Sequence, residues 1–192
     1  ADIVYDFSTN AAVDRFVFRN AIPSSPIPPT VNTIPTTPTT PGTNPIYVAV
    51  AASDSNFFTT NLIGDPNRAA VRFVFTISED PATLKSLAVS WEGQCPGSLI
   101  TAPNGTIQVY LWNASTSSYT LVGSTSSLED VTLTLLDTTN PAQYVDASNR
   151  VTILAVNTEN NTGISTDYVK LTVRQCSGDS DCDDDNPCTV DA

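Results

Sequence analysis

The sequence predicts an all-β protein, an antiparallel β-sandwich of roughly ten strands. Apolar and polar side chains alternate with a period of two through most of the chain, and Gly, Pro, Asn and Asp lie between these segments. No long stretch repeats apolar residues at a helical period. The chain has 192 residues with 40% hydrophobic content, which is enough for one sandwich with appendages.

Each expected strand is a short alternating or apolar segment. In chain order the segments are "IVYDF", "RFVF", "IYVAVAAS", "AAVRFVFTIS", "SLAVSWEG", "TIQVYLWNAS", "SYTLVGS", "DVTLTLLD", "RVTILAVNT" and "DYVKLTVRQ". In the fourth, Val71, Phe73 and Phe75 share the predicted inner face, and in the last, Val169 and Leu171 do so. The apolar run "IYVAVAAS" predicts a buried strand, and "DPATLKS" and "NPAQYVDASN" each predict one helical turn.

Composition divides the chain into four parts. Residues 1–20 predict two strands, residues 21–45 are a Pro/Thr-rich linker, residues 46–175 are the β-sandwich domain, and residues 176–192 are an acidic tail that contains cysteine and resembles an incomplete module. The linker favours extended polyproline II, because proline fixes φ and removes a hydrogen-bond donor. It could be a surface loop within one sandwich, a tether that lets the leading strands reach another copy, or a simple interdomain linker.

The leading segment carries apolar side chains that a sandwich lacking a strand could accept. We expect Ile3, Tyr5 and Phe7 on one strand and Phe16 and Phe18 on the next to fill the open edge of a body, either their own or that of a neighbour. Exchange from copy to copy in a head-to-tail manner does not close, and therefore produces a filament.

The charge and the missing residue types exclude several functions. The net charge is −12 with only eight Lys plus Arg, which argues against nucleic acid as a partner. No apolar run is long enough to span a bilayer. The chain has no His, so it lacks the commonest general base and metal ligand. No nucleophile–base pair or phosphate-binding loop is present, so we expect no enzyme activity and no catalytic residues.

The four cysteines predict disulfides in an oxidising compartment. We favour Cys95–Cys176 and Cys182–Cys188, with the alternative that a tail cysteine pairs beyond residue 192. The tail also places acidic residues at alternate positions, as short Ca²⁺-binding loops do. The predicted metal ligands are Asp179, Asp181, Asp183 and Asp185. A solvated acidic tail would have the same composition, and Ca²⁺ is the one cofactor that the sequence suggests.

Two further groups of side chains point to sugars, one as sites of glycosylation and the other as a surface on which a sugar ligand could stack. Three N-x-S/T sequons and the threonines of the linker are predicted glycosylation sites: Asn104, Asn113, Asn160, Thr36, Thr37, Thr39 and Thr40. Tyr110 and Trp112 share one strand face and could stack on a sugar ring if exposed, although burial in a core or an interface is the more common fate of large aromatic side chains.

Several segments resemble a known family. "YDFST…VDRFVFRN", "AASDSNFFTT", "AAVRFVFTISEDPATLKSLAVSWEG", "IQVYLWNASTSSYTLVG" and "YVDASNRVTILAVNT…STDYVKLTV" are similar to the galactose-binding-like jelly-roll domains of archaeal and bacterial extracellular proteins. The tail resembles acidic, cysteine-containing extracellular repeats, with Asp185 at a position where those repeats have Gly. The resemblance implies a jelly-roll-like sandwich at the cell surface and no catalytic set.

The sequence therefore predicts an extracellular, glycosylated structural subunit that polymerises into a filament by exchanging its N-terminal strands. The alternative is a carbohydrate- or surface-binding module of a larger secreted protein. The expected partners are further copies of the chain and glycans.

Overall fold

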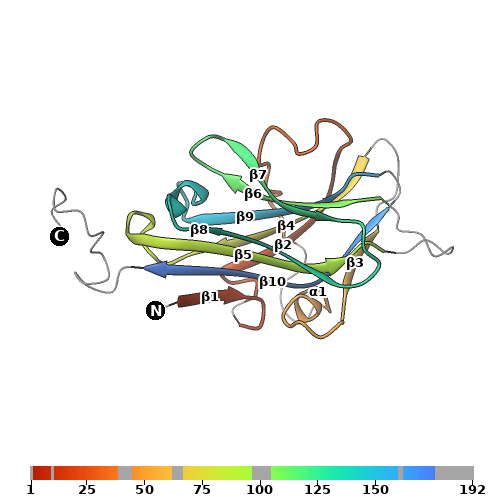
Figure 1. Cartoon of the computed structure of the whole chain (residues 1–192), viewed down its shortest axis with the longest axis horizontal. Coiled ribbons are helices and arrows are strands. Elements are labelled where there is room, and N and C mark those ends of the chain that lie inside the picture. Colours follow the sequence, from red (N-terminus) through yellow and green to blue (C-terminus); the bar gives the residue numbers. More distant parts are fainter. Residues whose placement is uncertain are drawn as a thin grey trace.

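The chain folds into a β-sandwich of two antiparallel sheets, as the sequence predicts (Figure 1). The computed structural model describes residues 2–9, 11–38, 45–61, 67–96, 105–159 and 162–175, and these contain ten strands, one short α-helix and two 3₁₀ turns. Sheet A comprises β1 (Asp2–Asp6), β3 (Phe58–Asn61), β5 (Leu84–Gln94), β8 (Val131–Asp137) and β10 (Gly163–Gln175). Sheet B comprises β2 (Arg15–Pro23), β4 (Asn67–Thr76), β6 (Ile107–Asn113), β7 (Ser118–Thr125) and β9 (Arg150–Asn157).

In both sheets, strands that are far apart in the sequence lie next to each other. Sheet A runs β1-β10-β5-β8, with β3 also pairing with β10, and sheet B runs β2-β4-β9-β6-β7. The helix α1 (Pro45–Ala49) precedes β3, and the 3₁₀ turns η1 (Pro81–Thr83) and η2 (Pro141–Tyr144) follow β4 and β8. Both turns lie where the sequence predicts them.

The core lies between the two sheets, where the period-two pattern places it. On β4, Val71, Phe73 and Phe75 are fully buried, and Val169 and Leu171 of β10 face them from sheet A. Burying a large apolar side chain stabilises the fold by roughly 1.5–3 kcal/mol relative to leaving it in water. The inner-face predictions for these strands are confirmed.

Both leading strands pair with their own chain. β1 pairs antiparallel with β10, with Tyr5 opposite Leu171, and β2 pairs with β4. Each is an edge strand, one in each sheet. The structure thus includes β1 and β2 in the sandwich as integral strands, and within the described chain no second copy is needed to complete either sheet.

The apolar residues of the leading segment do not all face the core. Tyr5 and Phe7 are in the core and Ile3 packs against it. On β2, however, Val17 faces the core, and Phe16 and Phe18 lie on the outer face of sheet B with their ring centroids 6.3 Å apart. The sequence-based prediction that both phenylalanines fill an inner edge is wrong, because β2 presents the other side of its pleat to sheet A.

The Pro/Thr-rich linker packs against its own sandwich. β2 continues to Pro23, and residues 24–38, here called the strap, run back across the outer face of sheet B. Ile34 and Pro35 of the strap line a hollow with Phe16 and Phe18, so these phenylalanines are covered from outside. An extended tether holding the strands at a distance does not describe residues 24–38; residues 39–44 lie outside the described residues.

The run "IYVAVAAS" forms the α1 turn and not the expected strand. Val50 donates a backbone hydrogen bond to Ile46 at 3.2 Å, and Pro45 begins the helix. Proline is favoured in the first helical turn, where its missing N–H costs nothing. A short apolar run has no periodicity that separates a buried strand from a buried helical turn.

We predict that Phe7→Ala destabilises the protein strongly. Phe7 is 3% exposed and packs against Phe73, Phe75 and Tyr47, with centroid distances of 5.2–6.1 Å. Removing a buried phenylalanine ring costs about 3–5 kcal/mol of unfolding free energy, measured by urea denaturation. Val13→Ala is the control, because Val13 is 74% exposed. Equal unfolding midpoints for the two variants would contradict the placement of the leading segment.

Candidate functional site

The strap is fixed to sheet B by one asparagine. Asn32 donates to Thr152 Oγ1 at 3.1 Å, and its Oδ1 accepts from Arg72 Nε at 3.3 Å and from the Tyr119 hydroxyl at 2.9 Å. Arg72 is only 2% exposed. Burial raises the pKa of Tyr119, partly offset by the guanidinium of Arg72. These bonds tie the strap to β4, β9 and β7, so the outer face of sheet B is a second buried layer.

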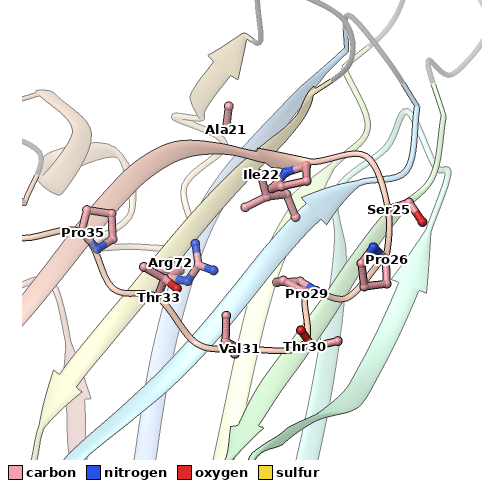
Figure 2. Close-up of a pocket in the computed structure, with 11 residues that line it drawn as sticks. Ala21, Ile22, Ser25, Pro26, Pro29, Thr30, Val31, Thr33, Pro35 and Arg72 are labelled. Atoms are coloured by element: carbon pink, nitrogen blue, oxygen red, sulfur yellow. The ribbon is translucent and has the colours of Figure 1, made fainter.

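A hollow of about 530 Å³ lies between the strap and sheet B (Figure 2). Its lining is mostly apolar, with Ile22 from β2 and several prolines of the strap, while Arg72 contributes a guanidinium. Pockets for small molecules have volumes of roughly 300–1,000 Å³ and combine apolar walls with a few polar groups. The hollow is therefore a candidate ligand-binding site.

The two aromatic side chains predicted to stack on a ligand differ in exposure. Tyr110 is 5% exposed, and its hydroxyl donates to Gln108 at 2.7 Å. It belongs to a buried cluster against which Ile27 of the strap packs, so it is not available for stacking; burial, which is the more common fate of large aromatic side chains, is the outcome for Tyr110. Trp112 is partly exposed and meets Tyr119 edge-on, with ring centroids 4.9 Å apart. Trp112 thus remains partly accessible next to Tyr119, the residue that donates to Asn32 of the strap.

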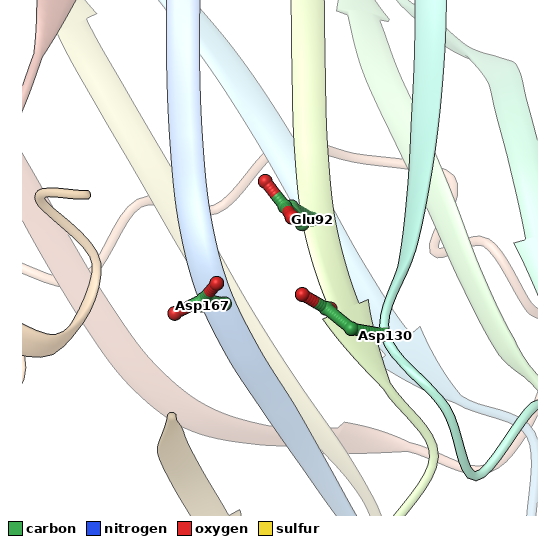
Figure 3. Close-up of side chains that lie close together, drawn as sticks. All are labelled: Glu92, Asp130 and Asp167. Atoms are coloured by element: carbon green, nitrogen blue, oxygen red, sulfur yellow. The ribbon is translucent and has the colours of Figure 1, made fainter. Parts of the chain in front are cut away.

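Three carboxylates converge on the outer face of sheet A (Figure 3). Glu92 lies on β5, Asp167 on β10, and Asp130 immediately precedes β8, so the three come from neighbouring strands. One oxygen from each lies within 4.8 Å of the others. At an effective dielectric constant of about 20, two unit charges about 4 Å apart repel by about 4 kcal/mol. Such a cluster needs a proton or a cation to offset the repulsion.

A β-bulge turns Asp167 towards the other two acids. The register of β10 against β5 shifts between Thr166 and Tyr168, which leaves Asp167 as the extra residue. Bulges re-aim a side chain in this way. Gly93, opposite Thr166, permits the close approach, because a Cβ there would lie 2.2 Å from the Ser165 carbonyl oxygen.

The segment before β3 holds the Asp167 carboxylate. Asp167 is fully buried, and its Oδ2 accepts hydrogen bonds from the backbone N–H groups of Asp54 and Ser55 at 3.1 and 3.2 Å. Its Oδ1 is buried and has no hydrogen-bond partner in the described part of the chain. Ser53 donates to Glu92 Oε1 at 2.9 Å. The geometry fixes one oxygen of Asp167 and leaves the second for a ligand.

The crowding perturbs the titration of the cluster. Burial, and then the neighbouring Glu92 and Asp167, raise the pKa of Asp130 to about 7. On the same face, burial and a 3.0 Å hydrogen bond to Asp6 raise the pKa of Tyr168 to about 12. Burial is the main cause of both pKa shifts, and neighbouring carboxylates add to each. Carboxylate oxygens without His or Cys make this cluster a candidate site for a hard cation.

The other predicted sites are placed only in part. Cys95 is buried, with its Sγ 3.4 Å from the carbonyl oxygen of Gly105. The predicted disulfide partners, metal ligands and several glycosylation sites lie outside the described residues: Cys176, Cys182, Cys188, Asp179, Asp181, Asp183, Asp185, Asn104, Asn160, Thr39 and Thr40. The two disulfides, the tail Ca²⁺ site and these glycosylation sites remain predictions.

The remaining glycosylation sites differ in accessibility. Thr36 and Thr37 are exposed on the strap, as a modified threonine must be. Asn113 is 7% exposed, its amide donates to Gln143 at 2.8 Å, and its Oδ1 accepts from the backbone of Thr116. The side chain is buried and both of its polar atoms are engaged, so the structure argues against the prediction for Asn113.

The sequence alone does not group Glu92 with Asp130 and Asp167. Each acid of the cluster lies in or beside an expected strand, which is a weak signal, since acids are common at strand ends. The partners of Glu92 are 38 and 75 residues away along the chain, as the positions of Asp130 and Asp167 show. Only the order β10-β5-β8 makes them neighbours.

Residues 12–175 match the family AF_1625_C, described as "Uncharacterized protein, C-terminal domain", and the chain belongs to this family. No curated protein matches the sequence significantly. None of the helices in the described part of the chain has the length and hydropathy that a membrane crossing requires.

Solved structures with a similar arrangement are distant. A xylan-binding module, CBM15, aligns over 91% of this chain and 97% of its own, with a TM-score of 0.45 and 13% identity. The enzymatically active domain of tailspike protein 4 of bacteriophage CBA120 aligns over 84% of this chain, with a TM-score of 0.44 and 11% identity. This chain spans only 19% of the tailspike chain.

We predict that chelator-treated protein loses stability as the pH rises from about 4 to about 7, in part because of Asp130. The folded state holds the Asp130 proton up to a pKa of about 7, whereas the unfolded chain releases it near 3.8. Between these values the unfolded state binds fewer protons, so this contribution falls with rising pH and is constant above the folded pKa.

Asp130→Asn removes this titration. The melting temperature of the variant, relative to the natural chain, should therefore rise over the same pH interval. Glu129→Gln is the control, because Glu129 is exposed and adjacent in sequence. If the difference in melting temperature between Asp130→Asn and the natural chain does not change with pH, the raised pKa of Asp130 and the close packing of the three acids are contradicted.

Proposed function

We propose that the chain is a non-catalytic ligand-binding module of a secreted or cell-surface protein, and that its ligand is a carbohydrate. The observation that carries the proposal is the hollow of about 530 Å³ enclosed by the strap and sheet B. A loop of this length that packs on a sheet is more often a functional element than a passive connection.

The chemistry of the hollow suits a sugar. A pyranose ring presents apolar C–H faces and a rim of hydroxyl groups. Pro26 and Pro29 supply flat apolar surfaces, and the charged guanidinium of Arg72 lies in the wall of the hollow. Thr30 and Thr33 place exposed hydroxyl groups along the strap. The hollow thus offers both apolar surfaces and polar groups, the two kinds of contact that a sugar ring makes.

Trp112 extends this surface. Asn32 lies between two lining residues of the strap and accepts a hydrogen bond from Tyr119, and Tyr119 contacts Trp112. A second sugar unit leaving the hollow in this direction would meet the indole ring. Aromatic rings combine a large apolar area with a polar edge, which suits such a contact.

The assignment to a secreted or surface protein rests on composition. Charged residues are 15% of the chain, and the four cysteines favour an oxidising compartment. The exposed Thr36 and Thr37 of the strap fit the proposed O-glycosylation. The lack of His removes the commonest catalytic base and supports a binding role over an enzymatic one.

A second candidate function is assembly into a filament by exchange of β1 and β2. It is favoured by one observation: both leading strands lie at sheet edges, and residues 24–44 alone connect them to the rest of the body. A terminal edge element on a long connection can be exchanged between copies at low cost.

We predict that the full chain binds glycans on an array, and that Thr33→Trp weakens binding at least about tenfold. Thr33 is exposed and lines the hollow, so an indole at this position fills the seat without disturbing the core. Thr37→Trp is the matched control, since Thr37 is exposed on the strap but does not line the hollow. An array without hits would reject carbohydrate as the ligand, and equal binding by both variants would reject the hollow as the seat.

The filament candidate predicts concentration-dependent polymers of the full chain. Size-exclusion chromatography with light scattering, followed by electron microscopy of the largest species, tests it directly. Polymers that disappear in Phe7→Ala, but persist when salt is added, would support exchange of the apolar strands. A protein that stays monomeric at every concentration would argue against filament assembly and leave ligand binding as the remaining proposed function.

A further inference from the structure

The carboxylate cluster on sheet A is independent of the strap and its hollow. It lies on the opposite outer face of the sandwich, with Glu92 on β5, Asp167 on β10 and Asp130 immediately before β8. Within the described chain, none of the three forms a salt bridge. The proposal that follows does not rest on the proposed function.

We propose that Glu92, Asp130 and Asp167 form a Ca²⁺-binding site, and that the bound ion fixes the segment of residues 51–56 against sheet A. The acids supply hard oxygen ligands from three strands, within 4.8 Å of one another. Oxygens around Ca²⁺ lie at about 2.3–2.6 Å from the ion, so opposite ligands are about 4.6–5.2 Å apart. The cluster therefore has the dimensions of one Ca²⁺ coordination sphere.

Asp167 gives an independent indication that a ligand belongs here. The residue is fully buried, and two backbone N–H groups hold its Oδ2. Its buried Oδ1 has no partner among the described residues, and Figure 3 shows an oxygen of Asp167 pointing towards the space it shares with Glu92 and Asp130. Buried polar atoms in folded proteins are almost always hydrogen-bonded or bound to an ion. A cation would satisfy this atom and offset the charge of its neighbours.

The ligand set distinguishes between metals. The cluster has no nitrogen or sulfur ligand, and Zn²⁺ sites are built mainly from Cys and His. Mg²⁺ demands near-ideal octahedral geometry and usually keeps several waters, whereas Ca²⁺ accepts several carboxylates in irregular arrangements. The Oγ of Ser53, which already contacts Glu92, is available as a further oxygen close to the site.

The segment of residues 51–56 links the site to the edge of sheet A. β3 pairs with residues 163–166 of β10, and β1 pairs with residues 170–174. Between them Ala51 bridges to Tyr168, and the backbone of Asp54 and Ser55 donates to Asp167. An ion that fixes the carboxylates thereby fixes the segment covering the gap between two edge strands. Loss of the ion leaves repelling acids beneath that segment and loosens it.

The test measures thermal unfolding and amide hydrogen exchange of the full chain in EGTA and in millimolar CaCl₂ or MgCl₂. We expect Ca²⁺ to raise the melting temperature and to slow exchange of the Asp54 and Ser55 amides, with Mg²⁺ at least about tenfold less potent. In Glu92→Gln and Asp130→Asn the potency of Ca²⁺ should fall at least about tenfold. Glu129→Gln, which changes the exposed neighbour of Asp130, should respond like the natural chain.

The acidic tail needs its own control. A double variant, Asp181→Asn with Asp183→Asn, should keep the Ca²⁺ response of the Asp54 and Ser55 amides. If that variant loses the response while Glu92→Gln retains it, Ca²⁺ acts through the tail and the proposal is wrong. A natural chain whose melting temperature and amide exchange ignore Ca²⁺ also overturns it. If both cluster variants fail to fold, hydrogen exchange of the natural chain still tests the proposal. Protection of the Asp54 and Ser55 amides by Ca²⁺ supports it, and protection elsewhere without these amides overturns it.

Discussion

The pairing of β10 along both of its edges is the interaction on which the rest of the structure depends. This 13-residue strand pairs with β5 on one side and, in turn, with β3, Ala51 and β1 on the other. It thereby ties the first strand of the chain to its last. Its inner residues fill the core, and its bulge at Asp167 brings three acids together on the outer face. One strand thus determines both the closure of the fold and the candidate cation site.

Sheet B is covered on both faces: sheet A packs on its inner face, and the strap packs on its outer face. This packing gives the Pro/Thr-rich linker a structural role. Arg72 and Val74 of β4 are each 2% exposed, although they point away from the core. The strap supplies the missing cover, with Ile27 and Asn32 as its main contacts. Prolines suit this role because their restricted backbone loses little conformational entropy on ordering. The same packing leaves the hollow that we propose as a ligand seat.

Sequence alone predicted the sandwich, the strand faces of β4 and β10 and the two 3₁₀ turns, because these follow from local alternation and from proline positions. It could not predict which face of β2 meets the core, since Phe16 and Val17 are both apolar and only the second sheet decides between them. Nor could it predict the strap, because packing on a distant sheet leaves no local pattern. The carboxylate cluster was missed for the same reason: its members become neighbours only through strand order.

The chain closes its own sandwich, with Tyr5 of β1 opposite Leu171 of β10 in the same molecule. Isotope-filtered NMR on a mixture of labelled and unlabelled chains, unfolded together and refolded, tests it most directly. Closure within one chain predicts contacts between the Tyr5 ring and the strand around Leu171 only within labelled molecules. Contacts between labelled and unlabelled molecules would contradict it and would return the leading strands to a neighbouring copy.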